Sequence, residues 1–115
     1  MDSSIINEKL LLNEYNNDFD RLRIYFIRHS ESNGHQMNCC TFIKCISQNL
    51  KFNSIEYDLQ LNDIFNKIYS LLVNQGVYIP SSHKIDFHGF LLCLQQISRL
   101  FHINLRILTK TLINS

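Results

Sequence analysis

The spacing of apolar residues over 61–73 is the feature that most constrains the fold. Apolar side chains recur there every three or four positions, which is the period of an α-helix with one buried face. The residues of this stripe are Leu61, Ile64, Phe65, Ile68, Leu71 and Leu72. Asn62 or Asp63 can cap its start, and Gly76 lies just past its end. We therefore predict a helix over residues 62–74.

A second helical stripe follows a loop signal at residues 80–82, which read Pro-Ser-Ser. Its members are Phe90, Leu91, Leu94, Ile97, Leu100 and Phe101. Their spacing predicts a helix over 90–101. Helical periodicity of this kind usually marks the side that faces the core.

Two other segments are typical of β-strands. Residues 22–27 read Leu-Arg-Ile-Tyr-Phe-Ile, a short β-branched and aromatic run that is followed by polar residues and Gly34. Over residues 103–108, Ile and Leu alternate with Asn and Arg, as in a half-buried strand. We expect strands at both places.

Strand, helix, helix and strand in this order predict an α/β fold. The expected architecture is a partial three-layer sandwich, with a mostly parallel sheet flanked by helices. A chain of 115 residues suits one domain. We assign residues 1–20 to a polar leader and residues 21–115 to the domain, and residues 39–57 fit either a helix or a loop.

Charge and hydropathy disfavour several classes of partner. The chain has 11 basic and 10 acidic side chains, and this net charge of +1 gives no basic surface for nucleic acid. A run of about 18 apolar residues, as a membrane span needs, is absent. The first residues also lack the basic start and apolar stretch of a signal peptide. We expect a cytoplasmic protein that binds neither nucleic acid nor membrane.

The four cysteines are interpreted as reduced, structural thiols, because the sequence carries no export signal. They are Cys39, Cys40, Cys45 and Cys93. A zinc site that adds His35 to the first three is disfavoured, since adjacent cysteines rarely direct both sulfurs at one ion and no CxxC pair is present. We expect no metal and no other cofactor.

The pair Arg28-His29 is the segment that most suggests chemistry. It follows the expected strand at 22–27, and open α/β sheets place their ligand sites at the carboxyl ends of strands. A neutral imidazole can attack phosphorus, and a guanidinium can hold phosphate oxygens through two hydrogen bonds. The pair therefore suits phosphoryl transfer, although two polar residues at the end of a strand are also common.

Residues 25–32, Tyr-Phe-Ile-Arg-His-Ser-Glu-Ser, resemble the signature of the histidine phosphatase superfamily, the phosphoglycerate mutase-like enzymes. In that family the first strand ends in Arg-His-Gly-Glu and then Ser or Thr. Residues 58–62 and 90–96 are similar in order and position to two further family motifs.

The resemblance implies a site that acts on a small phosphorylated substrate or binds an anion. It implies His29 and Arg28 as the catalytic residues, with His29 accepting the phosphoryl group. It implies Arg28, Ser32 and Asn33 as the phosphate-binding residues.

Departures from the family pattern predict a weak or inactive relative. Ser30 stands where the family has Gly, and Leu92 stands where it has a second phosphate-binding Arg. The family's second His and its acid lie downstream of the segment that ends at Ser115, so we expect a truncated or degenerate member. The residues that remain to replace the missing groups are Asp86, His88 and His102.

Two alternatives remain open. The chain fits a non-catalytic interaction module if the stripe at 90–101 is a docking surface. Residues 38–42 are also similar to the cysteine segment of OTU-type deubiquitinases, but Gln36 and Met37 replace the Asp-Gly of that motif. A cysteine without its local signature and its histidine partner is weak evidence for a protease.

Overall fold

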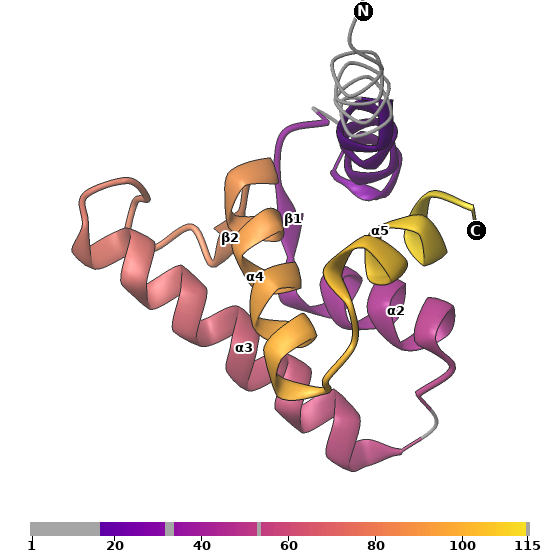
Figure 1. Ribbon diagram of the computed structural model, residues 1–115. Helices are drawn as coiled ribbons and strands as arrows, with labels where there is room; N and C mark the ends of the chain where they lie inside the picture. Colours follow the sequence, from indigo (N-terminus) through magenta and orange to yellow (C-terminus); the bar gives the residue numbers. More distant parts are fainter. Residues whose placement is uncertain (1–16, 32–33, 53, 115) are drawn as a thin grey trace, which may run out of the picture.

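The computed structural model describes residues 17–31, 34–52 and 54–114, which form helices joined by short connections (Figure 1). Residues 17–29 are helical and are called helix 17–29 below. The other elements are β1 (Met37–Asn38), α2 (Cys39–Leu50), α3 (Ile55–Asn74), β2 (Lys84–Ile85), α4 (Phe87–Leu100) and α5 (Leu105–Ile113).

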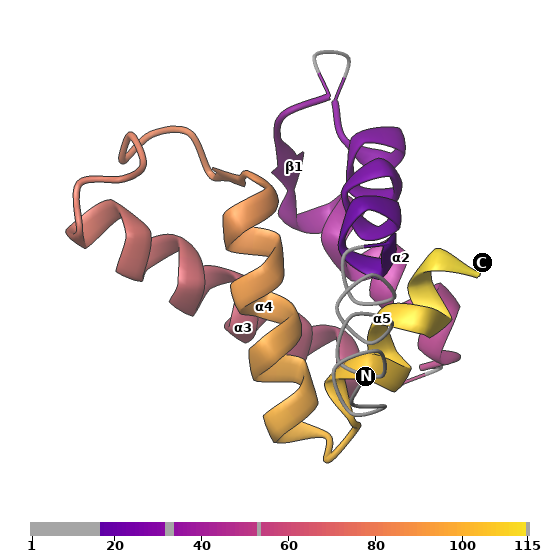
Figure 2. The ribbon, with the colours of Figure 1, turned by 45° about the horizontal axis from the view of Figure 1, so that its top comes forward.

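Most of these elements belong to two helix–loop–helix units that pair through their loops. Helix 17–29, β1 and α2 form the first unit, and α3, β2 and α4 form the second. The strands pair antiparallel, with Met37 opposite Ile85 and Asn38 opposite Lys84. In both views helix 17–29 and α3 lie on opposite sides of α4 (Figure 1, Figure 2). Helix α5 packs against α2 and α4.

The expected α/β sandwich is wrong. In the described part of the chain the sheet has two strands of two residues each, and these are antiparallel. So short a sheet cannot form a layer of its own, and the core lies between helices instead.

The strand expected at 22–27 is wrong because these residues lie within helix 17–29. The buried side chains of the run are Leu22, Tyr25 and Phe26. Their spacing of three and four places them on one helical face. Ile24 and Ile27 lie outside this face and are 50% and 47% exposed. Because the helix is apolar on both faces, its sequence looks like the continuous apolar run of a buried strand.

The strand expected at 103–108 is wrong because a helix begins after Asn104. The Asn104 side chain caps α5 by accepting hydrogen bonds from the backbone N–H groups of Arg106 at 2.9 Å and Ile107 at 3.3 Å. The side chains that α5 buries are Leu108 and Leu112, one turn apart. Ile107 is 62% exposed, so the alternating pattern does not follow burial.

Both predicted helices are confirmed, and both begin earlier than expected. The helix predicted at 62–74 is the later part of α3, whose first turn is capped by the hydroxyl of Ser54. The helix predicted at 90–101 corresponds to α4, which Asp86 caps by accepting a hydrogen bond from the N–H of Gly89 at 2.9 Å.

Two further expectations concern the leader at residues 1–20 and membrane-spanning helices. Residues 1–16 of the expected leader lie outside the described part, and residues 17–20 are helical and continuous with the domain. None of the described helices combines the length and apolar character that crossing a bilayer requires.

Four phenylalanine rings link the helices through the core. The ring centroids of Phe26 and Phe90 are 5.3 Å apart, those of Phe90 and Phe42 are 6.3 Å apart, and those of Phe42 and Phe65 are 5.7 Å apart. The rings come in turn from helix 17–29, α4, α2 and α3, and each side chain is at most 2% exposed. Aromatic pairs at such distances add about 0.5–1.5 kcal/mol each beyond area burial.

Replacing Gly89 by alanine tests the packing at the start of α4. A Cβ at this position would overlap the Tyr78 hydroxyl and would lie 3.0 Å from Ile85 Cβ. We expect Gly89→Ala to lower the free energy of unfolding by about 1–3 kcal/mol, as overpacking does. Denaturant titration measures the change. Because Tyr78→Phe removes the overlapping oxygen, the same substitution in that background should cost less; an equal cost in both would contradict this packing.

Candidate functional site

Arg28 and His29 are the last two residues of helix 17–29, and both are exposed. His29 Nδ1 lies 2.9 Å from the Tyr25 carbonyl oxygen, so Nδ1 carries the proton and donates it. The His29 ring also packs on Tyr25, with the ring centroids 4.2 Å apart. Ser30 Oγ donates to the Phe26 carbonyl. His29 and Ser30 thus satisfy carbonyls in the last turn of the helix, which is a capping role.

The electrostatics of this position do not favour a phosphate dianion. A helix carries a partial negative charge at its C-terminal end, and phosphates bind at N-terminal ends. The expected position of Arg28 and His29, at the carboxyl end of a strand, is wrong; a strand end lacks the field of a helix terminus. The other expected phosphate ligands, Ser32 and Asn33, lie outside the described residues.

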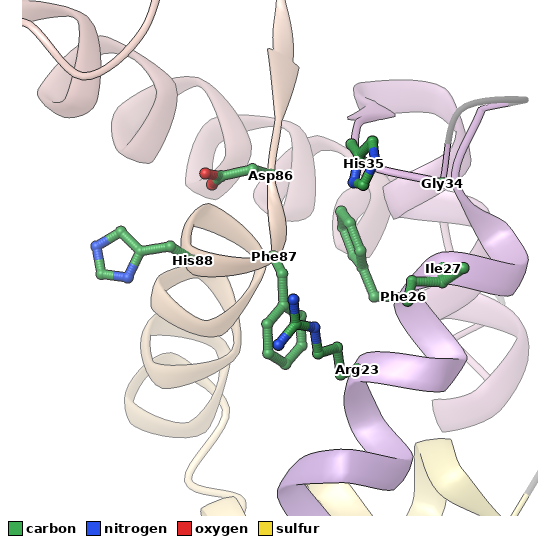
Figure 3. Close-up of a pocket in the computed structure, with 8 residues that line it drawn as sticks. All are labelled: Arg23, Phe26, Ile27, Gly34, His35, Asp86, Phe87 and His88. Carbon is green, nitrogen blue, oxygen red and sulfur yellow. The ribbon is translucent and has the colours of Figure 1, made fainter.

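A pocket of about 320 Å³ lies between helix 17–29 and the start of α4 (Figure 3). The residues that line it are Arg23, Phe26, Ile27, Gly34, His35, Asp86, Phe87 and His88. Its lining combines the apolar side chains of Phe26, Ile27 and Phe87 with the polar side chains of Arg23, His35, Asp86 and His88. Arg28 and His29 do not line this pocket, so the structure does not bring them together there with Asp86 or His88.

Asp86 has a structural role at the edge of the pocket. Its Oδ1 accepts hydrogen bonds from the N–H of Gly89 and from the hydroxyl of Tyr78. Burial raises the pKa of Tyr78, and the hydrogen bond to Asp86 raises it further. The Tyr78 hydroxyl therefore stays protonated and keeps this carboxylate oxygen occupied. The other candidate replacement, His102, lies beyond the C-terminal end of α4, away from the pocket.

The described residues of the two loops do not suit a metal ion. EF-hand calcium sites also lie between two helices, but they bind Ca²⁺ through several carboxylates and a bidentate glutamate. In the segments 30–38 and 75–86 the acidic residues are Glu31 and Asp86. Glu31 forms an ion pair with Lys84 at 2.8 Å, and Asp86 accepts hydrogen bonds from Tyr78 and Gly89. Within the described residues no group of three or more His, Cys, Asp or Glu could hold a metal.

The cysteines, all within the described residues, are free thiols. Cys39 lies at the first position of α2, and its Sγ donates a hydrogen bond to Asn62 Oδ1 at 3.3 Å. Burial, and secondarily the nearby Cys40, raise the pKa of Cys39 to about 11. Burial also raises the pKa of Cys93 and Cys45. A protonated, hydrogen-bonded Cys39 is a poor nucleophile, which disfavours the OTU-like alternative at this residue.

The reactivity of Cys39 can be checked directly by alkylation. With a pKa of about 11, only about a thousandth of Cys39 is thiolate at pH 8. We expect iodoacetamide at that pH to label the exposed Cys40 well before Cys39, with the rate at Cys39 rising as the pH approaches 11. Peptide mass spectrometry reads both sites in one sample, and the Cys40→Ser protein is the control. Preferential labelling of Cys39 at pH 8 would mean an activated thiol.

Comparison with known proteins does not assign a family. No family model matches the chain, and no curated protein or solved structure matches it. The pocket and the exposed faces beside it therefore carry the functional argument.

Proposed function

We propose that this protein is a non-catalytic interaction module that binds a partner protein through the outer face of helix 17–29 and the adjoining pocket. The observation that carries the proposal is the pair Ile24 and Ile27, which the helix presents to solvent at 50% and 47% exposure. Ile55 and Leu59 of α3 are also exposed one turn apart, so it is the adjoining pocket that distinguishes Ile24 and Ile27 as a binding surface.

The pocket extends this surface. Ile27 both lines the pocket and remains 47% exposed, so the pocket and the outer face are continuous. Small concave sites with apolar walls and a few polar groups are where proteins bind ligands or anchor side chains of partners. A cytoplasmic location is part of the proposal and is supported by the free thiols.

Phosphoryl transfer, which the resemblance implies, stays a second hypothesis. It is favoured by the hydrogen bond from His29 Nδ1 to the Tyr25 carbonyl, since this tautomer leaves the lone pair on Nε2. It is disfavoured by the helix C-terminus and by the structural role of Asp86. General acid help is worth about 10²–10⁴-fold, and the carboxylate nearest to His29 in the sequence, that of Glu31, is engaged in the ion pair with Lys84.

The interaction proposal is tested by selecting random peptides on the immobilised protein. We expect the wild-type protein to enrich a peptide family, and the double variant Ile24→Ser with Ile27→Ser to lose it. The matched control is Leu71→Ser with Ile79→Ser, which replaces two apolar residues of 46% and 71% exposure away from the pocket and should keep the enrichment. Failure to enrich any family, or enrichment that survives the first double variant, contradicts the proposal.

The phosphoryl-transfer hypothesis is tested by trapping phosphohistidine. The wild-type protein and His29→Ala are incubated with acetyl phosphate, and acid-labile phosphate on the protein is measured by phosphohistidine antibody and mass spectrometry. We expect no difference between them, because the negative end of the helix repels the donor. Label that His29→Ala abolishes, but that Cys39→Ala leaves intact, would favour phosphoryl transfer instead.

A further inference from the structure

We propose that the partner of this surface is an acidic protein segment that carries one large apolar side chain, and that this side chain enters the pocket beside Arg23. This inference rests on the proposed interaction function and names the chemistry of its partner. Three observations support it: the charges around the face, the size and walls of the pocket, and the limited extent of the apolar surface.

The charges around the face favour an acidic partner. Arg23 and Arg28 are exposed on helix 17–29, next to Ile24 and Ile27. The ion pairs found among the described residues, Lys84 with Glu31 and Lys110 with Asp18, involve neither arginine.

The acidic groups near this surface are largely engaged within the protein. Glu31 pairs with Lys84, and Asp86 binds Tyr78 and the first turn of α4. Asp20 is exposed on the same helix and has no ion pair among the described residues. Asp20 and Asp86 keep their negative charges, because hydrogen bonds to neutral groups do not cancel them. The exposed Arg21, Arg23 and Arg28 outnumber these two carboxylates, so the described residues around this surface carry a small net positive charge.

The pocket suits one side chain and not a cofactor. Its volume of about 320 Å³ is at the small end of the range for ligand sites. Phe26, Ile27 and Phe87 supply apolar parts of the wall, and Arg23 lines the same pocket (Figure 3). A Leu, Phe or Trp side chain could bury its surface here while a neighbouring carboxylate pairs with Arg23.

The geometry favours a protein segment over a lipid surface. A helix that lies on a membrane needs a broad, continuous apolar face, because it inserts that face into the headgroup boundary. Helix 17–29 exposes Phe19, Ile24 and Ile27 with arginines between them in the sequence, and further apolar side chains line the recessed pocket. A flat bilayer cannot fill a recess of this kind, whereas a single protruding side chain can.

The test uses three synthetic peptide pools and measures binding by fluorescence polarisation. The first pool has Asp and Glu around a central Leu, Phe or Trp, the second has Lys and Arg around the same centre, and the third has Asp and Glu around Ser. We expect the first pool to bind best, and its affinity to fall as NaCl rises from about 50 to about 500 mM. Arg23→Glu should weaken binding of the first pool by about tenfold or more.

The matched control variant is Arg99→Glu, at the opposite end of α4, which should leave the binding of the first pool unchanged. Circular dichroism confirms that both variants keep the helical fold. Vesicles of phosphatidylserine and phosphatidylcholine are tested in parallel with the wild-type protein and with Ile24→Ser, Ile27→Ser.

The possible results separate this inference from the proposed function. Equal or better binding of the basic pool or the serine-centred pool overturns the inference, and so does equal weakening by Arg99→Glu. Vesicle binding that depends on Ile24 and Ile27, without peptide binding, also overturns it. If random peptides are still enriched through these two residues in any of these cases, the interaction module stands. If neither the pools nor the random peptides bind, both proposals fail.

Discussion

The contact between Phe26 and Phe90 is the interaction on which the rest of the arrangement depends. Both side chains are almost fully buried, and their ring centroids are 5.3 Å apart. The Phe90 ring also contacts the Phe42 ring, and Phe42 contacts Phe65, so a row of four rings joins four helices. Phe87 adds a second contact, 5.7 Å from Phe26. Together with the contact of Phe19 and Phe87 at 5.3 Å, these contacts join helix 17–29 to α4, and the pocket is lined by residues of both helices.

Polar interactions then fix the positions of the loops. The pairing of Met37 with Ile85 and the ion pair of Lys84 with Glu31 hold the two loops side by side. The Tyr69 hydroxyl lies within hydrogen-bonding distance of the carbonyls of residues 79 and 80, at 3.0 and 2.7 Å, and accepts a hydrogen bond from the N–H of residue 83 at 3.0 Å. It thereby fixes the long connection between α3 and β2.

Helix 17–29 combines two roles that are usually divided between elements. One face supplies Phe26 to the core, and the other presents Ile24 and Ile27 beside Arg23. His29, the candidate catalytic residue, stabilises the C-terminal end of this helix by donating a hydrogen bond to the Tyr25 carbonyl. The same short segment therefore accounts for the apolar run and the histidine in physical terms, and it carries the surface for which we propose partner binding.

The sequence by itself determined the helices α3 and α4. Most members of their apolar stripes are buried, although Leu71 and Leu100 are 46% and 49% exposed, so the helical period was enough to predict them. The cap expected at Asn62 or Asp63 is wrong, because α3 begins at Ile55 and Ser54 caps it. It also indicated the free thiols correctly. The pocket could not be predicted, because its lining comes from residues 23–27, 34–35 and 86–88, which only tertiary contacts bring together.

Helix 17–29 and α5 were decided by the tertiary structure, for a related reason. The run at 22–27 has apolar residues on every side of a helix, and periodicity cannot tell that pattern from a buried strand. At 103–108 the alternation coincides with a loop and a helix start, where Asn104 caps and burial begins at Leu108. In both cases the secondary structure depended on which side chains are buried against other helices. That depends on where the other helices lie and not on the local order of residues.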